Sequence, residues 1–175
     1  RLAKVIFLGK QRMNPDRVGQ SPEVLAGLAQ FSIPPKTRIL ISEEAEIGWH
    51  RPLSAEKLNP VLAFYVANDE NHALELANNI AKFEGWGHSS VVHSDDPKIV
   101  AKFASIPTGR VLVNTPAILG GMGYSTDLEP SFMLGTGTWS GSITSDNVTA
   151  LHLINIKRVA YESRPWRDIY EEYGE

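Results

Sequence analysis

The stretch that decides the fold spans residues 87–113 and reads GHSSVVHSDDPKIVAKFASIPTGRVLV. Residues 88–93 are rich in valine and predict a strand. Asp96 and Pro97 predict a helix start, because proline suits the first helical turn, and apolar side chains follow at Ile99, Val100 and Phe103. Residues 109–113 predict a second strand. Strands separated by a helix of this length indicate an α/β protein with parallel strands.

The residues towards the N-terminus continue this pattern. Serine, proline and glutamate at 21–23 predict a helix start, because serine caps, proline suits the first turn and glutamate favours the positive end of the helix dipole. That helix should end before the prolines at 34–35. Residues 38–42 then predict a short strand.

A second strand and a longer helix follow. Residues 61–67 are almost continuously apolar and predict a buried strand. Asn68 and Asp69 are suited to cap the next helix, whose apolar side chains recur between 73 and 81. This helix should end at Gly85 or at Gly87, because glycine is the usual residue just beyond a helix.

The pattern changes after residue 114. Residues 120–141 are rich in glycine and show little periodicity, which predicts a long irregular loop. Loops of this length in compact domains are usually functional or disordered. Residues 151–161 return to an extended, apolar character.

Composition limits the function. The chain has 175 residues, a net charge of −3 and no cysteine. The charge gives no reason to expect nucleic acid or an acidic membrane surface as a partner. The absence of cysteine excludes disulfides, thiolate metal sites and a thiol nucleophile from these residues. The apolar runs are far shorter than the ~20 residues of a membrane helix, so we expect a soluble, cytoplasmic protein.

Six short motifs together suggest a family. They are AEKLNP at 55–60, GWGHSS at 85–90, VLVNTP at 111–116, GGMG at 120–123, LEPS at 128–131 and SDNV at 145–148. In this combination they resemble the C-terminal catalytic-domain portion of the CoA-acylating aldehyde dehydrogenases. That branch of the aldehyde dehydrogenase superfamily includes aldehyde-alcohol dehydrogenases and the acylating succinate-semialdehyde and sulfoacetaldehyde enzymes.

The resemblance implies a fold and an assembly. Residues 1–145 would form an α/β portion of the catalytic domain, with a mostly parallel sheet in a three-layer arrangement. Residues 146–175 would form a C-terminal strand and tail that leaves the domain and pairs with a neighbouring subunit. The resemblance therefore implies a homo-oligomer.

The resemblance also assigns two polar side chains. His88 would be the catalytic histidine beside the nucleophilic cysteine and would serve proton transfer, for which imidazole has a suitable pKa. Glu56 would be the cofactor-binding carboxylate that accepts hydrogen bonds from the nicotinamide ribose hydroxyls. Glu56 precedes one predicted strand, and His88 stands at the start of another. From the residues alone, His88 could equally be satisfied by backbone at a helix end, and Glu56 could be a solvated loop carboxylate.

A substrate pocket is implied as well, formed by Asn114, Thr115, Pro116 and Ile118. A strand end with an asparagine turn explains the same residues without a ligand. Four further histidines show no metal-ligand spacing, so no metal site is predicted: His50, His72, His93 and His152.

The implied reaction interconverts an aldehyde and an acyl-CoA through a cysteine thioester, with NAD or NADP as cofactor and coenzyme A as co-substrate. The nucleophile and the dinucleotide-binding domain would lie in a missing N-terminal portion, and many relatives carry a further cysteine where this chain has Thr136. Taken alone, the chain should be inactive. Two other interpretations stay open: a non-catalytic paralogue or oligomerisation module, and a flavodoxin-like ligand-binding domain.

Overall fold

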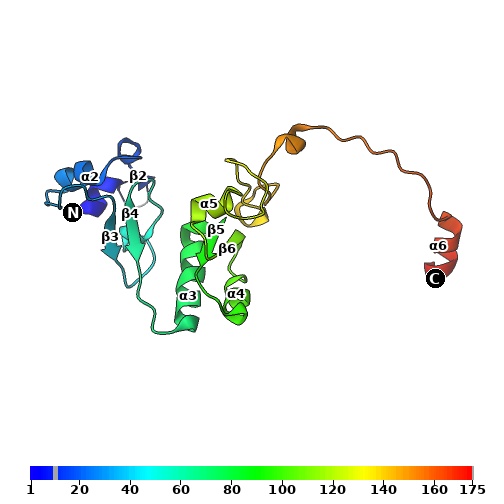
Figure 1. Cartoon of the computed structure of the whole chain (residues 1–175), viewed down its shortest axis with the longest axis horizontal. Helices are drawn as coiled ribbons and strands as arrows, with labels where there is room; N and C mark the ends of the chain where they lie inside the picture. The colour runs from blue at the N-terminus through cyan, green and yellow to red at the C-terminus, as the bar shows by residue number, and fades with distance from the viewer. Residues whose placement is uncertain (10–11, 175) are drawn as a thin grey trace.

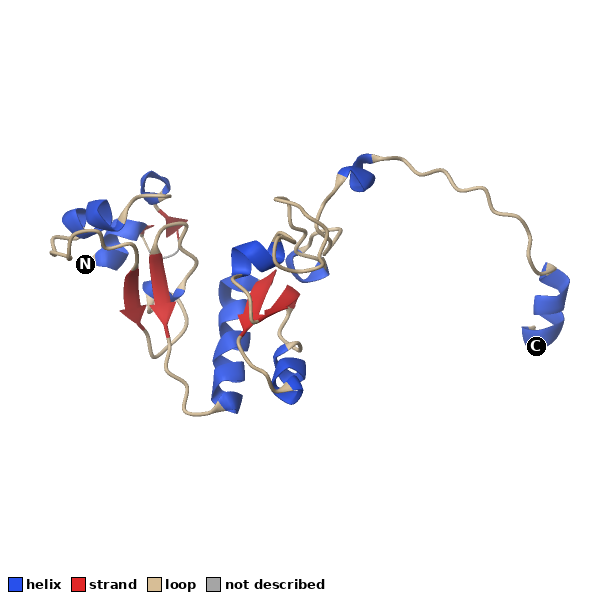
Figure 2. Ribbon diagram, in the orientation of Figure 1, coloured by secondary structure: helices blue, strands red, loops and turns tan. Residues whose placement is uncertain are grey.

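The computed structural model describes residues 1–9 and 12–174, in two groups of elements followed by an extended tail (Figures 1 and 2). The N-terminal group contains α1 (Leu2–Ile6), β1 (Phe7–Leu8), β2 (Arg12–Met13), α2 (Pro22–Leu28), β3 (Leu40–Glu43) and β4 (Val61–Phe64), with 3-10 turns at Pro15–Arg17 and Pro52–Ser54. The second group contains α3 (Glu70–Ile80), a π-helical segment (Ala81–Gly85), β5 (Gly87–Val92), α4 (Pro97–Phe103), β6 (Thr108–Val113) and α5 (Ala117–Gly121). Further along are 3-10 turns at Thr138–Ser140 and Ala150–Leu153, and the helix α6 (Trp166–Tyr173).

The strands pair in three two-stranded sheets. β1 and β2 are antiparallel, whereas β3 pairs with β4, and β5 with β6, in parallel. In the β5–β6 pair Gly87 lies opposite Thr108 and Val92 opposite Val113, with α4 as the crossover. The predicted α/β class with parallel strands is thus confirmed, but β3–β4 and β5–β6 are separate sheets.

Side-chain caps fix the predicted helix starts. Ser21 accepts a hydrogen bond from the Val24 amide at 3.4 Å, and Asp96 accepts one from the Lys98 amide at 2.8 Å. Asp69 caps α3 in the same way. These bonds satisfy amide groups that have no partner within their own helices, which is why the local sequence predicts the helix starts well.

One cluster of buried apolar side chains lies in the N-terminal group, and Ala81, Val92, Ile106 and Leu112 are buried in the second group. The buried side chains of the N-terminal cluster are Ile6, Phe7, Leu25, Leu40, Ala55 and Val61. The Trp49 ring packs edge-on against Phe7, with ring centroids 5.9 Å apart, and against Phe83, at 5.4 Å. Because Phe83 belongs to the π-helical segment, it joins the second group of elements to this core.

Two expected elements differ from the structure. The strand predicted as buried over residues 61–67 ends at Phe64, and the Leu62 and Phe64 side chains are half exposed. Only one face of β4 packs on the core, so burial alternates along it. The irregular loop expected from residue 120 begins later, because Gly120 and Gly121 are the buried end of helix α5.

The C-terminal segment leaves the folded groups (Figure 1). Residues 150–153 form a 3-10 turn capped by Thr149 and His152, where an extended chain was expected. Residues 154–165 are extended and exposed, and they lead to α6. Throughout residues 1–9 and 12–174, every helix is too short or too polar to cross a membrane.

Candidate functional site

A cavity of about 320 Å³ contains both Glu56 and His88 in its wall. β4 and the loop before it form one side, and the end of α3, the π-helical segment and the start of β5 form the other. The lining residues are Ser54, Ala55, Glu56, Lys57, Val61, Leu62, Ala63, Ile80, Glu84, Gly85 and His88. Two residues 32 positions apart in the sequence therefore share one site.

His88 is exposed at the start of β5, and its ring orientation follows from the preceding residues. Its Nδ1 lies 3.2 Å from the backbone oxygen of Trp86. A carbonyl oxygen can only accept, so in the neutral ring Nδ1 carries the proton and Nε2 is free to accept one. This arrangement suits a general base.

Gly87 makes the turn that presents His88. Its φ of +74° lies in the left-handed region, and a Cβ built there would meet the Thr136 backbone oxygen at 2.0 Å. Only glycine allows this close approach between the start of β5 and the glycine-rich loop. Thr136 thus packs through its backbone beside the His88 segment.

Trp86 is held at both ends of its side chain. Its indole N–H donates to the Lys82 backbone oxygen at 2.6 Å, and its ring meets Trp139 edge-on with centroids 5.4 Å apart. These contacts fix the residue whose carbonyl orients His88. Trp139 comes from the glycine-rich loop, so that loop also supports the site.

Glu56 is exposed, and its backbone rather than its side chain is tied down. Its amide donates to Oε2 of Glu84 at 2.6 Å. Glu56 lines the cavity, and a carboxylate can accept hydrogen bonds from vicinal hydroxyl groups such as those of a ribose. The chemistry of this position therefore fits a nucleoside ribose.

Lys57 brings a half-buried cation to the same wall. Its ammonium donates to the backbone oxygens of Leu53 and Ala55. Burial lowers the pKa of Lys57, and the negative charges of Glu44 and Glu84 oppose that shift. Through its hydrogen bonds to these two carbonyl oxygens, Lys57 stabilises the loop that carries Glu56.

The four residues expected to form the aldehyde pocket lie at the other end of the β5–β6 pair. Asn114 follows the last residue of β6, whereas His88 lies near the first residue of β5, and the two strands are parallel. The Asn114 side chain accepts from the Ser94 amide at 3.0 Å and donates to the Ser94 oxygen at 3.1 Å. It joins the ends of the two strands.

The remaining three pocket residues lie just before α5 or within it. Thr115 is buried and shares a hydrogen bond with Ser125, Pro116 precedes the helix, and Ile118 is 71% exposed. The structure does not bring these residues to the cavity that holds His88 and Glu56. Their substrate role stays a prediction.

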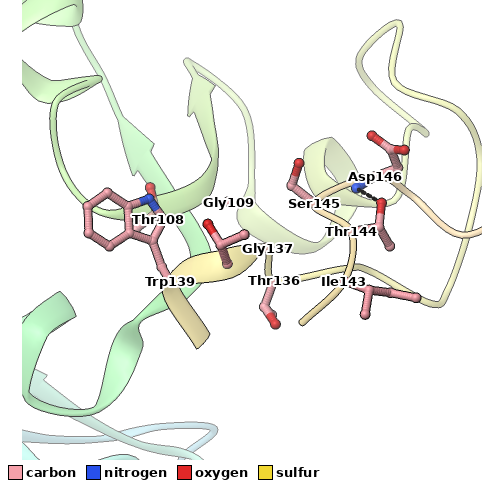
Figure 3. A pocket seen from close by; sticks show the side chains of 10 residues that line it. Thr108, Gly109, Thr136, Gly137, Trp139, Ile143, Thr144, Ser145 and Asp146 are labelled. Atoms are coloured by element: carbon pink, nitrogen blue, oxygen red, sulfur yellow. Dashed lines mark hydrogen bonds between the residues drawn. The ribbon is translucent and has the colours of Figure 1, made fainter. Parts of the chain in front are cut away.

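A second cavity, of about 410 Å³, lies between the start of β6 and the glycine-rich loop (Figure 3). Thr108 and Gly109 lie on one side, and residues 136–139 and 143–146 complete its wall. Asp146 is the sole ionisable side chain among the residues that line it. Because the lining has neither a histidine nor a pair of carboxylates, the cavity with His88 is the better candidate site.

Arg110 holds this loop against the sheet. The side chain is buried, and its guanidinium donates to the backbone oxygens of Gly135 at 2.8 Å and Ser145 at 2.9 Å. A third bond reaches the Ser89 hydroxyl at 3.3 Å. Burial lowers the pKa of Arg110, which nevertheless keeps its charge at any physiological pH.

Sequence reasoning missed Lys57, Glu84 and Arg110. A single arginine within the apolar strand TGRVLV was a usable signal, because a charged side chain there must find buried acceptors. Nothing in the local sequence singles out Glu84. Across the described ranges 1–9 and 12–174, no group of three or more acidic, histidine or cysteine side chains could hold a metal ion.

The fold and the cavity define an α/β protein whose parallel strands bring a carboxylate and a histidine to one site. No family model matches the chain. It is 41% identical over 161 residues to the bifunctional aldehyde-alcohol dehydrogenase AdhE of Escherichia coli, an alignment that covers 89% of this chain and 18% of that protein.

Two solved structures are similar over nearly the whole chain. A probable aldehyde dehydrogenase from Listeria monocytogenes has a TM-score of 0.88 at 43% identity, covering 96% of this chain and 37% of that one. An acetylating aldehyde dehydrogenase from Geobacillus thermoglucosidasius has a TM-score of 0.87 at 39% identity, with 94% and 36% covered. The chain is thus homologous to one portion of the acylating aldehyde dehydrogenases, and it spans less than two fifths of these relatives.

Proposed function

We propose that this chain is part of a CoA-acylating aldehyde dehydrogenase, which interconverts an aldehyde and an acyl-CoA. The observation that carries the proposal is the cavity lined by both Glu56 and His88. The homology to acylating enzymes, and the motif around His88, support the same conclusion. The substrates would be a small aldehyde or an acyl-CoA, with NAD or NADP as cofactor and coenzyme A as co-substrate.

In this proposal His88 moves protons. Its free Nε2 would accept a proton from a thiol, either that of the nucleophile or that of incoming coenzyme A, and return it in the reverse reaction. The nucleophile would be a cysteine supplied by another stretch of polypeptide, because these 175 residues contain none. The chain would be inactive without that portion.

Glu56 would bind and orient the cofactor. Its carboxylate would hold the nicotinamide ribose hydroxyls, and its backbone is already fixed by Glu84. When bound, the nicotinamide supplies the hydride acceptor or donor. Asn114, Thr115, Pro116 and Ile118 are proposed to contact the aldehyde, in keeping with the motif at 111–116 and the residues that follow it.

The assembly is part of the proposal. Residues 1–145 would belong to a three-layer catalytic domain, and residues 146–175 would pair with a neighbouring subunit of a cytoplasmic homo-oligomer. The tail supports this, because its apolar side chains are exposed where a partner strand could cover them: Leu153, Ile154, Ile156, Val159 and Tyr161.

Complementation tests this function. The purified chain should give no NAD reduction with aldehyde and coenzyme A, whereas the chain joined to a preceding portion that carries the cysteine should give coenzyme A-dependent turnover. Turnover by the chain alone would exclude the role assigned to an external cysteine. An inactive joined protein that folds and binds no NAD would favour the non-catalytic paralogue.

A further inference from the structure

Glu84 lines the proposed site and links the two groups of elements by a hydrogen bond. It lies in the π-helical segment at the end of α3, and its Oε2 accepts the amide hydrogen of Glu56 at 2.6 Å. The two residues are 28 positions apart in the sequence. A carboxylate that accepts from a backbone amide forms one of the stronger hydrogen bonds in proteins.

The segment that carries Glu84 is itself anchored. Phe83, its neighbour, packs edge-on against Trp49 of the N-terminal core at 5.4 Å. A π-helical turn holds one more residue than an α-helical turn, and such insertions are frequent at functional sites. Two consecutive side chains of this turn therefore contact the N-terminal group.

Lys57 holds the other side of the same loop. Its ammonium bonds the backbone oxygens of Leu53 and Ala55, which precede Glu56. Glu84 also attracts this ammonium. The backbone around Glu56 is thus fixed from both directions, while the Glu56 side chain stays exposed on the cavity wall.

We propose that Glu84 is a positioning residue for cofactor binding: it fixes the Glu56 backbone so that the Glu56 carboxylate meets the cofactor ribose. This inference rests on the proposed function, because it takes Glu56 as the ribose-binding group. Glutamine at position 84 keeps an oxygen that can accept the amide hydrogen, whereas alanine removes it. The pair of substitutions therefore separates the charge of Glu84, which both variants lack, from its hydrogen-bonding side chain, which alanine alone removes.

Hydrogen exchange tests the contact without any assay of activity. In the 175-residue chain, Glu84→Ala should speed exchange of the Glu56 amide at least about tenfold, the equivalent of about 1.4 kcal/mol. Glu84→Gln should have a smaller effect. Glu75→Ala, at an exposed position on α3, should have none. Unchanged exchange in Glu84→Ala would overturn the proposal.

Steady-state kinetics with NAD test whether Glu84 positions Glu56 for cofactor binding. In the assembled enzyme, Glu84→Ala should raise the KM for NAD about tenfold and change kcat by less than about twofold, because the cofactor loop alone is loosened. Glu84→Gln should restore the KM, and Glu75→Ala should match wild type. A lower yield of folded enzyme with an unchanged KM would show a purely structural residue and overturn the role. If the assembled enzyme binds no NAD, the proposed function fails, and the exchange result still reports the contact.

Discussion

At the scale of single residues, Gly87 decides where His88 lies. Its left-handed backbone and its contact with the Thr136 oxygen leave no room for a side chain. We expect Gly87→Ala to lower the free energy of unfolding by at least about 2 kcal/mol, from backbone strain and the clash.

Urea unfolding followed by circular dichroism measures this change. Gly27 is the matched control, because it lies in α2 with no atom near the position of a Cβ. Gly27→Ala should instead stabilise the chain by about 0.5–1 kcal/mol through helix propensity. Equal effects of the two substitutions would show that the Gly87 turn is not required.

Lys57 should make the free energy of unfolding depend on pH, which is a second prediction for a single residue. Burial depresses its pKa, so the unfolded chain binds the proton more tightly than the folded one. The contribution of Lys57 to stability should therefore rise as pH increases from the depressed pKa to about 10.4, the ordinary lysine value, and fall in the other direction. The difference in unfolding free energy between wild type and Lys57→Met should follow this trend. A difference that stays constant across alkaline pH would contradict it.

At the scale of elements, Arg110 fixes the glycine-rich loop on β6 through two backbone oxygens. Arg110→Met keeps much of the side-chain volume but loses three hydrogen bonds, so the free energy of unfolding should fall by about 2–4 kcal/mol. Lys98→Met, on the exposed face of α4, should change it by less than about 0.5 kcal/mol. Similar unfolding midpoints for both variants would show that Arg110 is not needed for the loop.

The elements also show what the sequence can predict. Helix starts at Ser21, Asp69 and Asp96 follow from local capping chemistry, and their positions are confirmed. The strand pair around His88 follows from valine content and spacing. The contacts Glu84–Glu56 and Arg110–Gly135 are not predictable in this way, because each joins residues that meet only after the chain folds.

The candidate site could be predicted from the sequence only in part, because distant residues meet only after the chain folds. The shared location of Glu56 and His88 was expected from motif resemblance alone, because the strand that follows Glu56 and the strand that contains His88 belong to different sheets. The separation of Asn114 from His88 was predictable, because the sequence indicates parallel strands with His88 at the start of one and Asn114 just beyond the end of the other, and the structure confirms it. Strand direction decides that separation, and a motif carries no information about it.

At the scale of the whole molecule, the C-terminal tail stands apart from the folded groups (Figure 1). Residues 154–165 are exposed, and the tail keeps several apolar side chains in contact with water. Truncation after residue 153 should leave the unfolding midpoint unchanged, because little packing is lost. If the tail pairs with a neighbouring subunit as proposed, sedimentation velocity should show self-association of the 175-residue chain and none of the truncated chain. A lower midpoint would contradict the first expectation, and an unchanged oligomer would contradict the second.

The central claim is that His88 transfers protons to and from a thiol supplied by another stretch of polypeptide. The most direct test is the coenzyme A-dependent rate of the assembled enzyme with His88→Ala, beside His93→Ala as a control just beyond the other end of β5. We predict that His88→Ala lowers kcat at least about 100-fold and that His93→Ala changes it by less than about twofold. A wild-type rate in His88→Ala would contradict the account.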